Sequence, residues 1–256
     1  MRIALGVEYD GSSYLGWQSQ PGKNTVQDCL QDALSKLADA PVSVIAAGRT
    51  DTGVHASEQV VHFETAALRP PTAWVRGSNA LLPHGIAVLW AHEVDNEFHA
   101  RFSAQARSYR YKLCCRPVRS PLLHGKAGWF HLPLDISAMQ SAADFLLGEH
   151  DFSAFRAAEC QAKSPVKQMY QLNIRKHGEL IVLDLKANAF LHHMVRNIVG
   201  SLVYVGKGKF SPEWMKEVLE SRNRSQAAPT FSAAGLYLRH ISYDPKWKLP
   251  QLSVDE

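Results

Sequence analysis

Strand and helix patterns follow one another in an order that occurs twice along this chain, and this repetition limits the possible folds most strongly. In the first half we expect a strand over 2–9, a helix over 26–37, strands over 43–47 and 59–63, a helix over 72–82 and a strand over 86–93. This β-α-β-β-α-β order is typical of ferredoxin-like folds. Thr25, with Asp28 three residues later, is a capping-box variant that starts the first helix.

The second half shows the same order of elements without a residue-level repeat. Expected here are a strand over 108–115, a helix over 136–147, strands over 171–176 and 180–187, a helix over 192–205 and a strand over 235–243. The two middle strands form a hairpin that turns at His177-Gly178, and Ser211-Pro212 opens a further helix. At 256 residues the chain suits two domains. We therefore predict an α+β protein of two ferredoxin-like, RRM-like α/β lobes over 1–104 and 105–256.

Charge is distributed unevenly between the two halves. The first hundred residues carry 6 Lys and Arg against 11 Asp and Glu, whereas the remainder carries 22 against 13. Seven basic residues and no acidic residue lie between positions 101 and 134. Such a run favours binding to a polyanion. The alternative is a solvated strand face whose charges are balanced by the acidic half of the fold.

Neither a targeting segment nor a cofactor site is indicated. The apolar start from Ile3 to Val7 is interrupted by Glu8 and Asp10, which makes it too short for a signal peptide or a membrane span. We therefore expect a cytoplasmic protein without membrane segments. Neither a phosphate-binding loop nor a zinc site is complete, so the motifs predict no cofactor and no metal.

The most informative segment runs from Gly48 to Ala56, with the sequence GRTDTGVHA. Its two glycines indicate a loop between strands, which can present a carboxylate to a ligand from a rigid scaffold. Asp51 is thus a candidate nucleophile or base. For an arbitrary Asp in such a turn, an Asx-turn in which it bonds only its own backbone would be the favoured interpretation. An aspartic protease is a remote alternative, because that chemistry needs two carboxylates and the chain has a single Asp-Thr-Gly triplet.

This segment resembles the signature of A-type tRNA pseudouridine synthases, and further matches extend the resemblance over nearly the whole chain. The other matching stretches are 9–12 with 16–18, 98–104, 107–111, 151–156, 186–190, 192–200 and 235–238. Thr52 stands where this family more often has Ala, and Thr230-Phe231-Ser232 interrupts a stretch that usually carries another proline. The resemblance implies that the two lobes form one continuous, mostly antiparallel sheet with an active-site cleft between them.

The resemblance also implies an activity and its residues. Family members are isomerases that convert uridine to pseudouridine at positions 38, 39 and 40 of the tRNA anticodon stem-loop, without cofactor or metal. Their nucleophile is the Asp of the signature, here Asp51. By matching position, Arg196 is expected to form an ion pair with Asp51 and keep it charged. Tyr109 is expected to stack on the target uracil. Arg49 is a candidate for holding the flipped-out nucleotide. The expected partners are tRNA and a second copy of the chain, as a homodimer.

Without the resemblance, Tyr109 and Arg196 each allow a second interpretation. Tyr109 and Tyr111 alternate with Arg110 and Lys112, which suits RNA binding or a packed core face equally well. Arg196 lies on a predicted helix, where a phosphate contact or a surface cation would be the simpler role. A non-catalytic RNA-binding module is therefore the rival hypothesis to a uridine isomerase.

Overall fold

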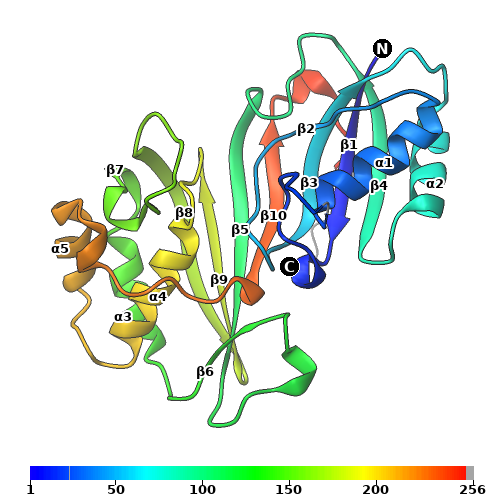
Figure 1. The fold of residues 1–256 in the computed structure, drawn as a ribbon. Helices are drawn as coiled ribbons and strands as arrows, with labels where there is room; N and C mark the ends of the chain where they lie inside the picture. Colours follow the sequence, from blue (N-terminus) through cyan, green and yellow to red (C-terminus); the bar gives the residue numbers. More distant parts are fainter. Residues whose placement is uncertain (23, 252–256) are drawn as a thin grey trace. The chain divides into compact units, whose positions relative to one another are not determined.

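The computed structural model describes residues 1–22 and 24–251, and the chain divides into two compact units. The first unit comprises Met1–Gln105 together with the chain from Leu238 onwards, and the second comprises Ala106–Tyr237. The described residues form an α+β protein with ten strands, mostly in antiparallel pairs, and five α-helices (Figure 1). The division differs from the predicted lobes, because the residues after Leu238 belong to the first unit and not to the second.

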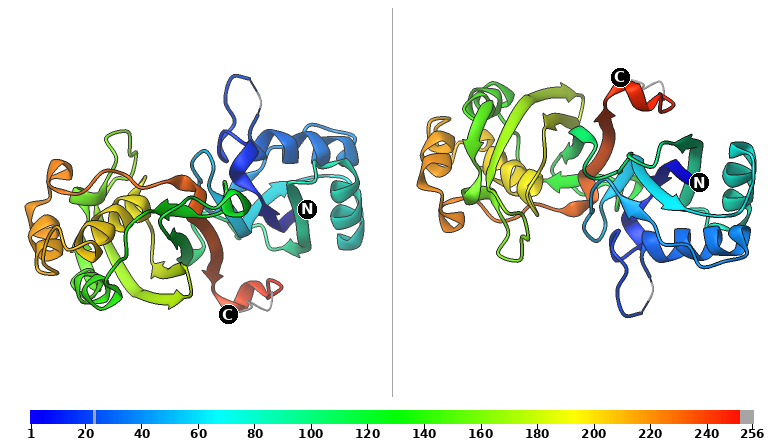
Figure 2. Two further views of the ribbon diagram at one scale, coloured as in Figure 1. Left: turned by 90° about the horizontal axis from the view of Figure 1, so that it is seen from below. Right: turned by 90° about the horizontal axis from the view of Figure 1, so that it is seen from above.

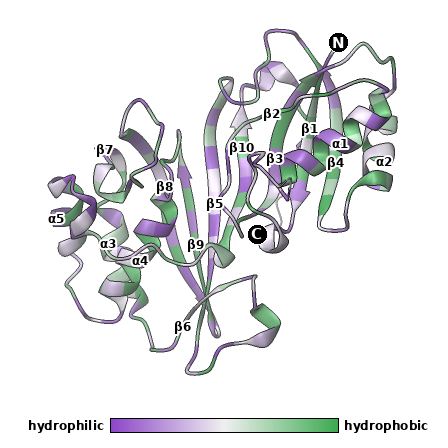
Figure 3. Ribbon diagram, viewed as in Figure 1, coloured by the Kyte–Doolittle hydropathy of each residue, from purple (hydrophilic) through white to green (hydrophobic). Residues whose placement is uncertain are grey.

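The first unit is built on a sheet with two helices. Its elements are β1 (Arg2–Tyr9), α1 (Val26–Ala38), β2 (Ile45–Ala46), β3 (His55–Glu64), α2 (Pro71–Leu81), β4 (Ile86–Val94) and most of β10 (Leu236–Tyr243). The strand order is β4-β1-β3-β10, with β2 beside β3. Antiparallel register joins β1 to both β3 and β4. Hydrophobic residues run along β3 and β4 (Figure 3).

Both helices of the first unit pack on the same face of its sheet. Thr25 caps α1 as predicted, since the Asp28 N–H donates to the Thr25 hydroxyl over 3.2 Å. That hydroxyl donates in turn to the Asp28 carboxylate. α1 and α2 lie side by side (Figures 1 and 2). The ring of Phe63 on β3 meets Trp74 of α2 edge-on at 5.2 Å, and both side chains are buried. This contact anchors the helical layer on the sheet.

Two predicted strands of the first unit have different bounds. The strand expected over 43–47 is reduced to Ile45–Ala46. Val42 and Val44 are buried, but their N–H groups donate to Ser35 and Gln31 of α1, so this stretch is bound to the helix and not to the sheet. β3 begins at His55 and not at residue 59.

The second unit holds a longer run of strands and three helices. Its elements are β5 (Ala104–Cys115), β6 (Gly128–Phe130), α3 (Ile136–Asp144), β7 (Gly148–Asp151), β8 (Val166–His177), β9 (Leu180–Ala187), α4 (Met194–Gly206) and α5 (Trp214–Ser221). The strand order is β5-β9-β8-β7, and the short β6 pairs with β5 in parallel. The hairpin of β8 and β9 turns at His177-Gly178 as predicted, with Gly178 at φ 59°.

Three further features of the second unit differ from the prediction. The short strands β6 and β7 were not expected from the sequence. Ser211 does not cap the last helix directly, because α5 begins at Trp214, whose N–H donates to the Ser211 carbonyl over 3.2 Å. Ser211 and Pro212 therefore form a turn that leads into the helix.

No helix in the described chain is long and apolar enough to cross a membrane.

A buried histidine joins β3 to the turn that precedes β5. His62 is 2% exposed, and its Nδ1 accepts the Ala100 N–H over 3.1 Å. His99 lies against it with ring centroids 4.9 Å apart. Burial is the main cause that lowers the pKa of His62 from 6.5 to about 4, and the charges of the nearby His99 and Arg2 lower it further. The imidazole is therefore neutral at pH 7 and acts as a hydrogen-bond acceptor.

This histidine predicts a loss of stability in mild acid. Because the pKa of His62 is lower in the folded chain than in the unfolded chain, its stabilising contribution is present above pH 6.5 and is lost as the pH falls towards 4. A shift of this size corresponds to roughly 3 kcal/mol at most. In His62→Asn, the amide oxygen can accept the Ala100 N–H without titrating. We expect urea unfolding of this variant to depend less on pH between 7 and 4.5 than that of the wild type. Parallel losses in both proteins would contradict this role of His62.

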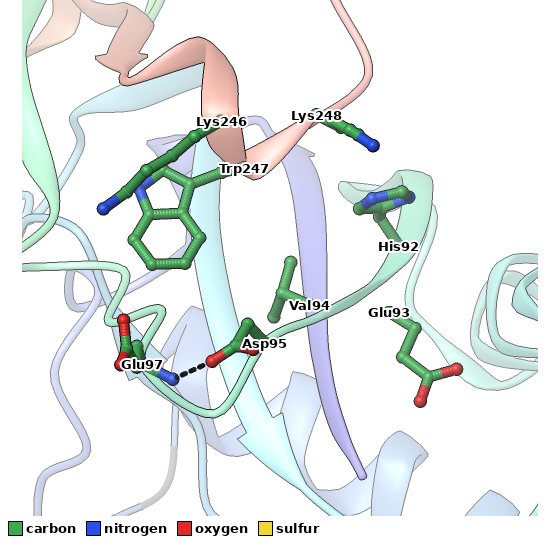
Figure 4. A pocket seen from close by; sticks show the side chains of 8 residues that line it. All are labelled: His92, Glu93, Val94, Asp95, Glu97, Lys246, Trp247 and Lys248. Atoms are coloured by element: carbon green, nitrogen blue, oxygen red, sulfur yellow. Dashed lines mark hydrogen bonds between the residues drawn. The ribbon is translucent and has the colours of Figure 1, made fainter.

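A pocket of about 350 Å³ lies at the edge of the first unit (Figure 4). Its lining comes from the end of β4, the residues that follow it and the short helix Pro245–Trp247, namely His92, Glu93, Val94, Asp95, Glu97, Lys246, Trp247 and Lys248. In the register of β1 with β4, Arg2 faces Val94 whereas Tyr9 faces Ile86. The pocket is therefore at the opposite end of β1 from Asp10, and it contains none of the predicted site residues.

Candidate active site

Asp51 lies in the loop between β2 and β3, and backbone hydrogen bonds hold this loop on both sides. The Trp17 N–H donates to the Thr50 carbonyl over 3.0 Å, and the Val54 N–H donates to the Asp51 carbonyl over 3.1 Å. The side-chain amide of Gln59 donates to the Gly48 carbonyl over 2.8 Å. The loop is thus fixed to the segment after β1 and to β3, as expected of a rigid scaffold for a reactive group.

The segment between β1 and α1 forms a cradle for this loop. The Tyr9 and Thr50 hydroxyls lie 2.8 Å apart and share a hydrogen bond. A Cβ on Gly11 would lie 1.9 Å from the Val54 carbonyl oxygen, so only glycine permits this approach. A Cβ on Gly16, at φ 87°, would lie 2.6 Å from the Thr50 carbonyl oxygen. The stretches 9–12 and 16–18, singled out in the sequence, therefore support the Asp51 loop.

The side chain of His55 also supports the Asp51 loop. Its side chain is 2% exposed, and its Nδ1 accepts the Gly11 N–H over 3.1 Å. The Asp10 carboxylate lies 3.1 Å from the same nitrogen. The sequence alone assigned no role to His55, and its place in the segment GRTDTGVHA was the only available signal.

The side chains of the Asp51 loop differ in exposure. Arg49 is exposed, Thr50 is buried and Asp51 is half-buried. Alternation of this kind turns Thr50 inward, onto Tyr9, and leaves its two charged neighbours accessible from outside. The loop can therefore present a carboxylate and a guanidinium to a polar substrate.

Tyr109 lies on β5 in the second unit, where it faces Leu185 of β9 in the antiparallel register. Its ring meets Phe190 edge-on with centroids 5.0 Å apart, and it is half-buried. Tyr111, two residues along, is completely buried, and its hydroxyl donates to the Ser232 carbonyl over 2.7 Å. Burial raises the pKa of Tyr111, so it stays protonated. Tyr111 is thus a core residue, whereas Tyr109 is only half-buried.

Part of the positive charge on β5 and just after it is paired with acidic residues within the second unit. Arg110 forms a bidentate ion pair with Asp184, at 2.6 and 3.1 Å. Arg116 bonds to Glu179 over 3.2 Å and to the Val118 carbonyl over 2.6 Å. The Lys112 ammonium lies 4.6 Å from the centroid of the Tyr237 ring. For Arg110 and Arg116, the interpretation as a balanced face is the better one, although the balancing acids lie in the same half of the chain.

Arg196 lies in the first turn of α4 and is half-buried. Its Nε donates to the Phe231 carbonyl over 2.9 Å, and the Phe231 N–H donates back to the Arg196 carbonyl over 3.2 Å. Phe231 also meets Tyr111 edge-on at 6.1 Å. The structure therefore links the arginine to β5 through Phe231. Because Asp51 and Arg196 belong to different units, their expected ion pair stays a prediction.

Comparisons with known proteins identify the chain. The model of the family described as tRNA pseudouridine synthase matches residues 6–103 and 142–244. "tRNA pseudouridine synthase A" of Methylobacillus flagellatus is 60% identical over 98% of this chain and 96% of its own length. The protein of the same name from Nitrosomonas eutropha is 56% identical over 99% of this chain and 92% of its own length. The protein of the same name from Janthinobacterium sp. is 59% identical over 99% of this chain and 96% of its own length.

Among solved structures, a chain of "Crystal Structure of a Cbf5-Nop10-Gar1 Complex" aligns with 92% of this chain and 48% of its own length, with a TM-score of 0.38 and 12% identity. That similarity is too low to support an inference. The identification therefore comes from the family match and from the curated relatives, which the chain matches over nearly its full length. The chain belongs to the tRNA pseudouridine synthase family, and its activity is that of a tRNA pseudouridine synthase A, an isomerase.

Proposed function

We propose that this enzyme isomerises uridines at positions 38, 39 and 40 of the tRNA anticodon stem-loop, with Asp51 as its nucleophile. The observation that carries the proposal is the Asp51 loop, which is fixed at Thr50 by Trp17 and Tyr9 and presents a half-buried carboxylate. A rigidly held carboxylate lowers the barrier of a reaction by keeping the nucleophile in reach of the reacting atom.

The reaction is balanced without any added group. The bond between ribose C1′ and uracil N1 breaks, the uracil turns, a bond forms between C1′ and C5, and the C5 proton leaves while N1 gains one. No electron or functional group enters, so the proposed enzyme uses neither cofactor nor metal. Attack on C1′, addition to the uracil ring and removal of a ribose proton all require the Asp51 carboxylate to be ionised.

Three further residues complete the proposed site. Tyr109 stacks on the uracil, and its edge-to-face contact with Phe190 at 5.0 Å supports this role by fixing the ring. Arg196 forms an ion pair with Asp51 and keeps it charged, and the bond from its Nε to Phe231 supports a fixed guanidinium. Arg49 is exposed in the Asp51 loop, which suits a contact with the flipped-out nucleotide or its phosphate.

The proposal extends to the partners and to the arrangement of the lobes. The tRNA would be held by basic residues of the second half of the chain, through phosphate contacts that weaken with salt. We propose a cytoplasmic homodimer that binds tRNA across both subunits. We further propose that the ferredoxin-like lobes share a continuous sheet and that the tRNA anticodon arm enters a cleft between them.

Mapping the modified positions tests the proposal. Unmodified tRNA transcripts with uridine at positions 38, 39 and 40 are compared with transcripts carrying cytidine at all three. Pseudouridine is located by carbodiimide modification and primer extension. We expect stops only in the first transcript, and only at these positions. Binding of both transcripts with modification of neither would favour the non-catalytic RNA-binding module, and stops elsewhere would refute the assignment of positions.

A further inference from the structure

Arg196 receives its backbone partner from a segment that is remote in sequence. Phe231 both accepts from the Arg196 Nε and donates to the Arg196 carbonyl, at 2.9 and 3.2 Å. A pair of bonds between the same two residues fastens the stretch 228–232 to the first turn of α4. Because a guanidinium is a planar fork, fixing its Nε edge also sets the direction of its two terminal nitrogens.

Three polar side chains hold this segment on α4, and we call them the Asn197 cluster: Asn197, Arg224 and Thr230. The completely buried Asn197 lies at the centre, and its Oδ1 accepts from the Thr230 hydroxyl at 2.6 Å and from the Arg224 guanidinium at 3.1 Å. The same guanidinium donates to the Thr230 hydroxyl over 3.1 Å. The Asn197 amide donates to the Phe155 carbonyl over 2.8 Å, which fixes the direction of the amide.

Close packing on either side of the cluster leaves the segment little freedom. A Cβ on Gly200 would lie 2.2 Å from the Pro229 carbonyl oxygen. The Ala228 N–H donates to the Ser201 hydroxyl over 3.3 Å. At the other end, the Ser232 carbonyl accepts from Tyr111. Contacts with α4 and β5 therefore fix the path of the stretch 228–232 past Arg196.

We propose that the Asn197 cluster positions the Arg196 guanidinium for uridine isomerisation. Its members act on the guanidinium through the Phe231 carbonyl, so they are positioning residues. This inference rests on the role of Arg196 given under Proposed function. It assigns a catalytic consequence to Thr230, a half-buried residue whose side-chain partners all lie on its own unit.

Thr230→Val tests the inference. The substitution places a methyl group where a hydroxyl now lies 2.6 Å from the Asn197 oxygen, whereas a carbon and an oxygen need about 3.3 Å. The segment must therefore shift by several tenths of an ångström. Small misplacements of this kind reduce turnover by about 10- to 100-fold. Loss of the bond to the buried Asn197 lowers the unfolding midpoint, so the assay is run at a temperature where the variant is folded. There we expect kcat to fall by that factor while KM for tRNA stays unchanged.

Two matched variants separate positioning from general damage. Thr230→Ser keeps the hydroxyl and is expected to restore most of kcat. Ser225→Ala removes a hydroxyl that lies just before the stretch 228–232 and bonds only to Asn223 in the described structure, and it is expected to keep full turnover. Wild-type kcat in Thr230→Val, or no recovery in Thr230→Ser, would overturn the inference.

A double variant distinguishes failure of this inference from failure of the proposed function. Arg196→Lys removes the fork that the cluster would position, so adding Thr230→Val to it should cause no further loss of kcat. Multiplied losses in the double variant would show that Thr230 acts independently of Arg196 and would refute positioning alone. Full turnover of Arg196→Lys would instead refute the role of Arg196 and, with it, any positioning of that residue.

Discussion

Replacing Asp51 with asparagine is expected to reduce pseudouridine formation by at least about 10³-fold while leaving the fold and tRNA binding intact. The amide has the shape of the carboxylate but is neither an ionised nucleophile nor a base. Backbone bonds hold the loop through the carbonyls of Thr50 and Asp51, and these bonds do not depend on the Asp51 side-chain charge. Nucleoside analysis of the treated tRNA measures the product, and filter retention measures binding.

Thr52→Ala is the matched control for this experiment. Thr52 is the exposed neighbour of Asp51, and the family more often has alanine at this position, so activity should be kept. Loss of activity in both variants would indicate that the loop tolerates no change and would leave Asp51 without a special role. Wild-type turnover in Asp51→Asn would rule out the carboxylate as nucleophile.

Gly11→Ala is expected to have the second largest effect, because it acts on the cradle of the Asp51 loop. The new Cβ would lie 1.9 Å from the Val54 carbonyl oxygen, which is backbone and can move only if the loop moves. Forced overpacking of this kind typically costs about 1–3 kcal/mol. The same displacement also shifts Asp51, so we expect turnover to fall by roughly 100-fold at a temperature where the variant is folded.

Gly48→Ala provides the comparison at the other end of the loop. A Cβ at Gly48 would meet no atom within 4 Å, so its unfolding free energy should stay within about 0.5 kcal/mol of the wild type. Urea unfolding of both variants measures the difference. Equal stability of Gly11→Ala and Gly48→Ala would contradict the close approach on which the cradle depends.

Local signals in the sequence were sufficient to predict several elements. The Thr25 cap lies three residues from Asp28, and the His177-Gly178 turn joins two adjacent strands, so the interactions that form them are close in sequence. The tRNA pseudouridine synthase family was also recognised from motifs in the sequence, and the comparisons confirm the family. The roles of Asp51, Tyr109, Arg196 and Arg49 remain predictions.

Features that depend on distant partners were not predictable in this way. β3 begins earlier than expected because the polar residues His55 and Glu58 before Gln59 are buried. Glu58 accepts from Trp90 over 3.1 Å, and His55 accepts from the Gly11 N–H over 3.1 Å. A hydrophobic pattern cannot indicate that a polar residue will find a buried partner elsewhere in the chain. The start of the predicted strand 43–47 illustrates the reverse case, since the apolar Val44 indicated a strand but its N–H bonds to Gln31 of α1.

The same limitation applies to the candidate site. Charge grouping correctly marked β5 as basic but could not show that Asp184, far along the sequence, neutralises Arg110. Alternation placed Tyr109 and Tyr111 together, but the hydrogen bond to Ser232 that makes Tyr111 a core residue depends on a segment that begins more than a hundred residues later. The supporting role of His55 and the Asn197 cluster could be recognised only in the folded structure.

Release of the C5 hydrogen tests the central claim most directly, because isomerisation displaces it whichever route Asp51 takes. A tRNA transcript carrying tritium at uracil C5 is incubated with the purified wild type and with Asp51→Asn, without added cofactor or metal. The account predicts that the wild type releases tritium to water and the variant does not. Equal release from both proteins, or none from a wild type that still binds the tRNA, would contradict it.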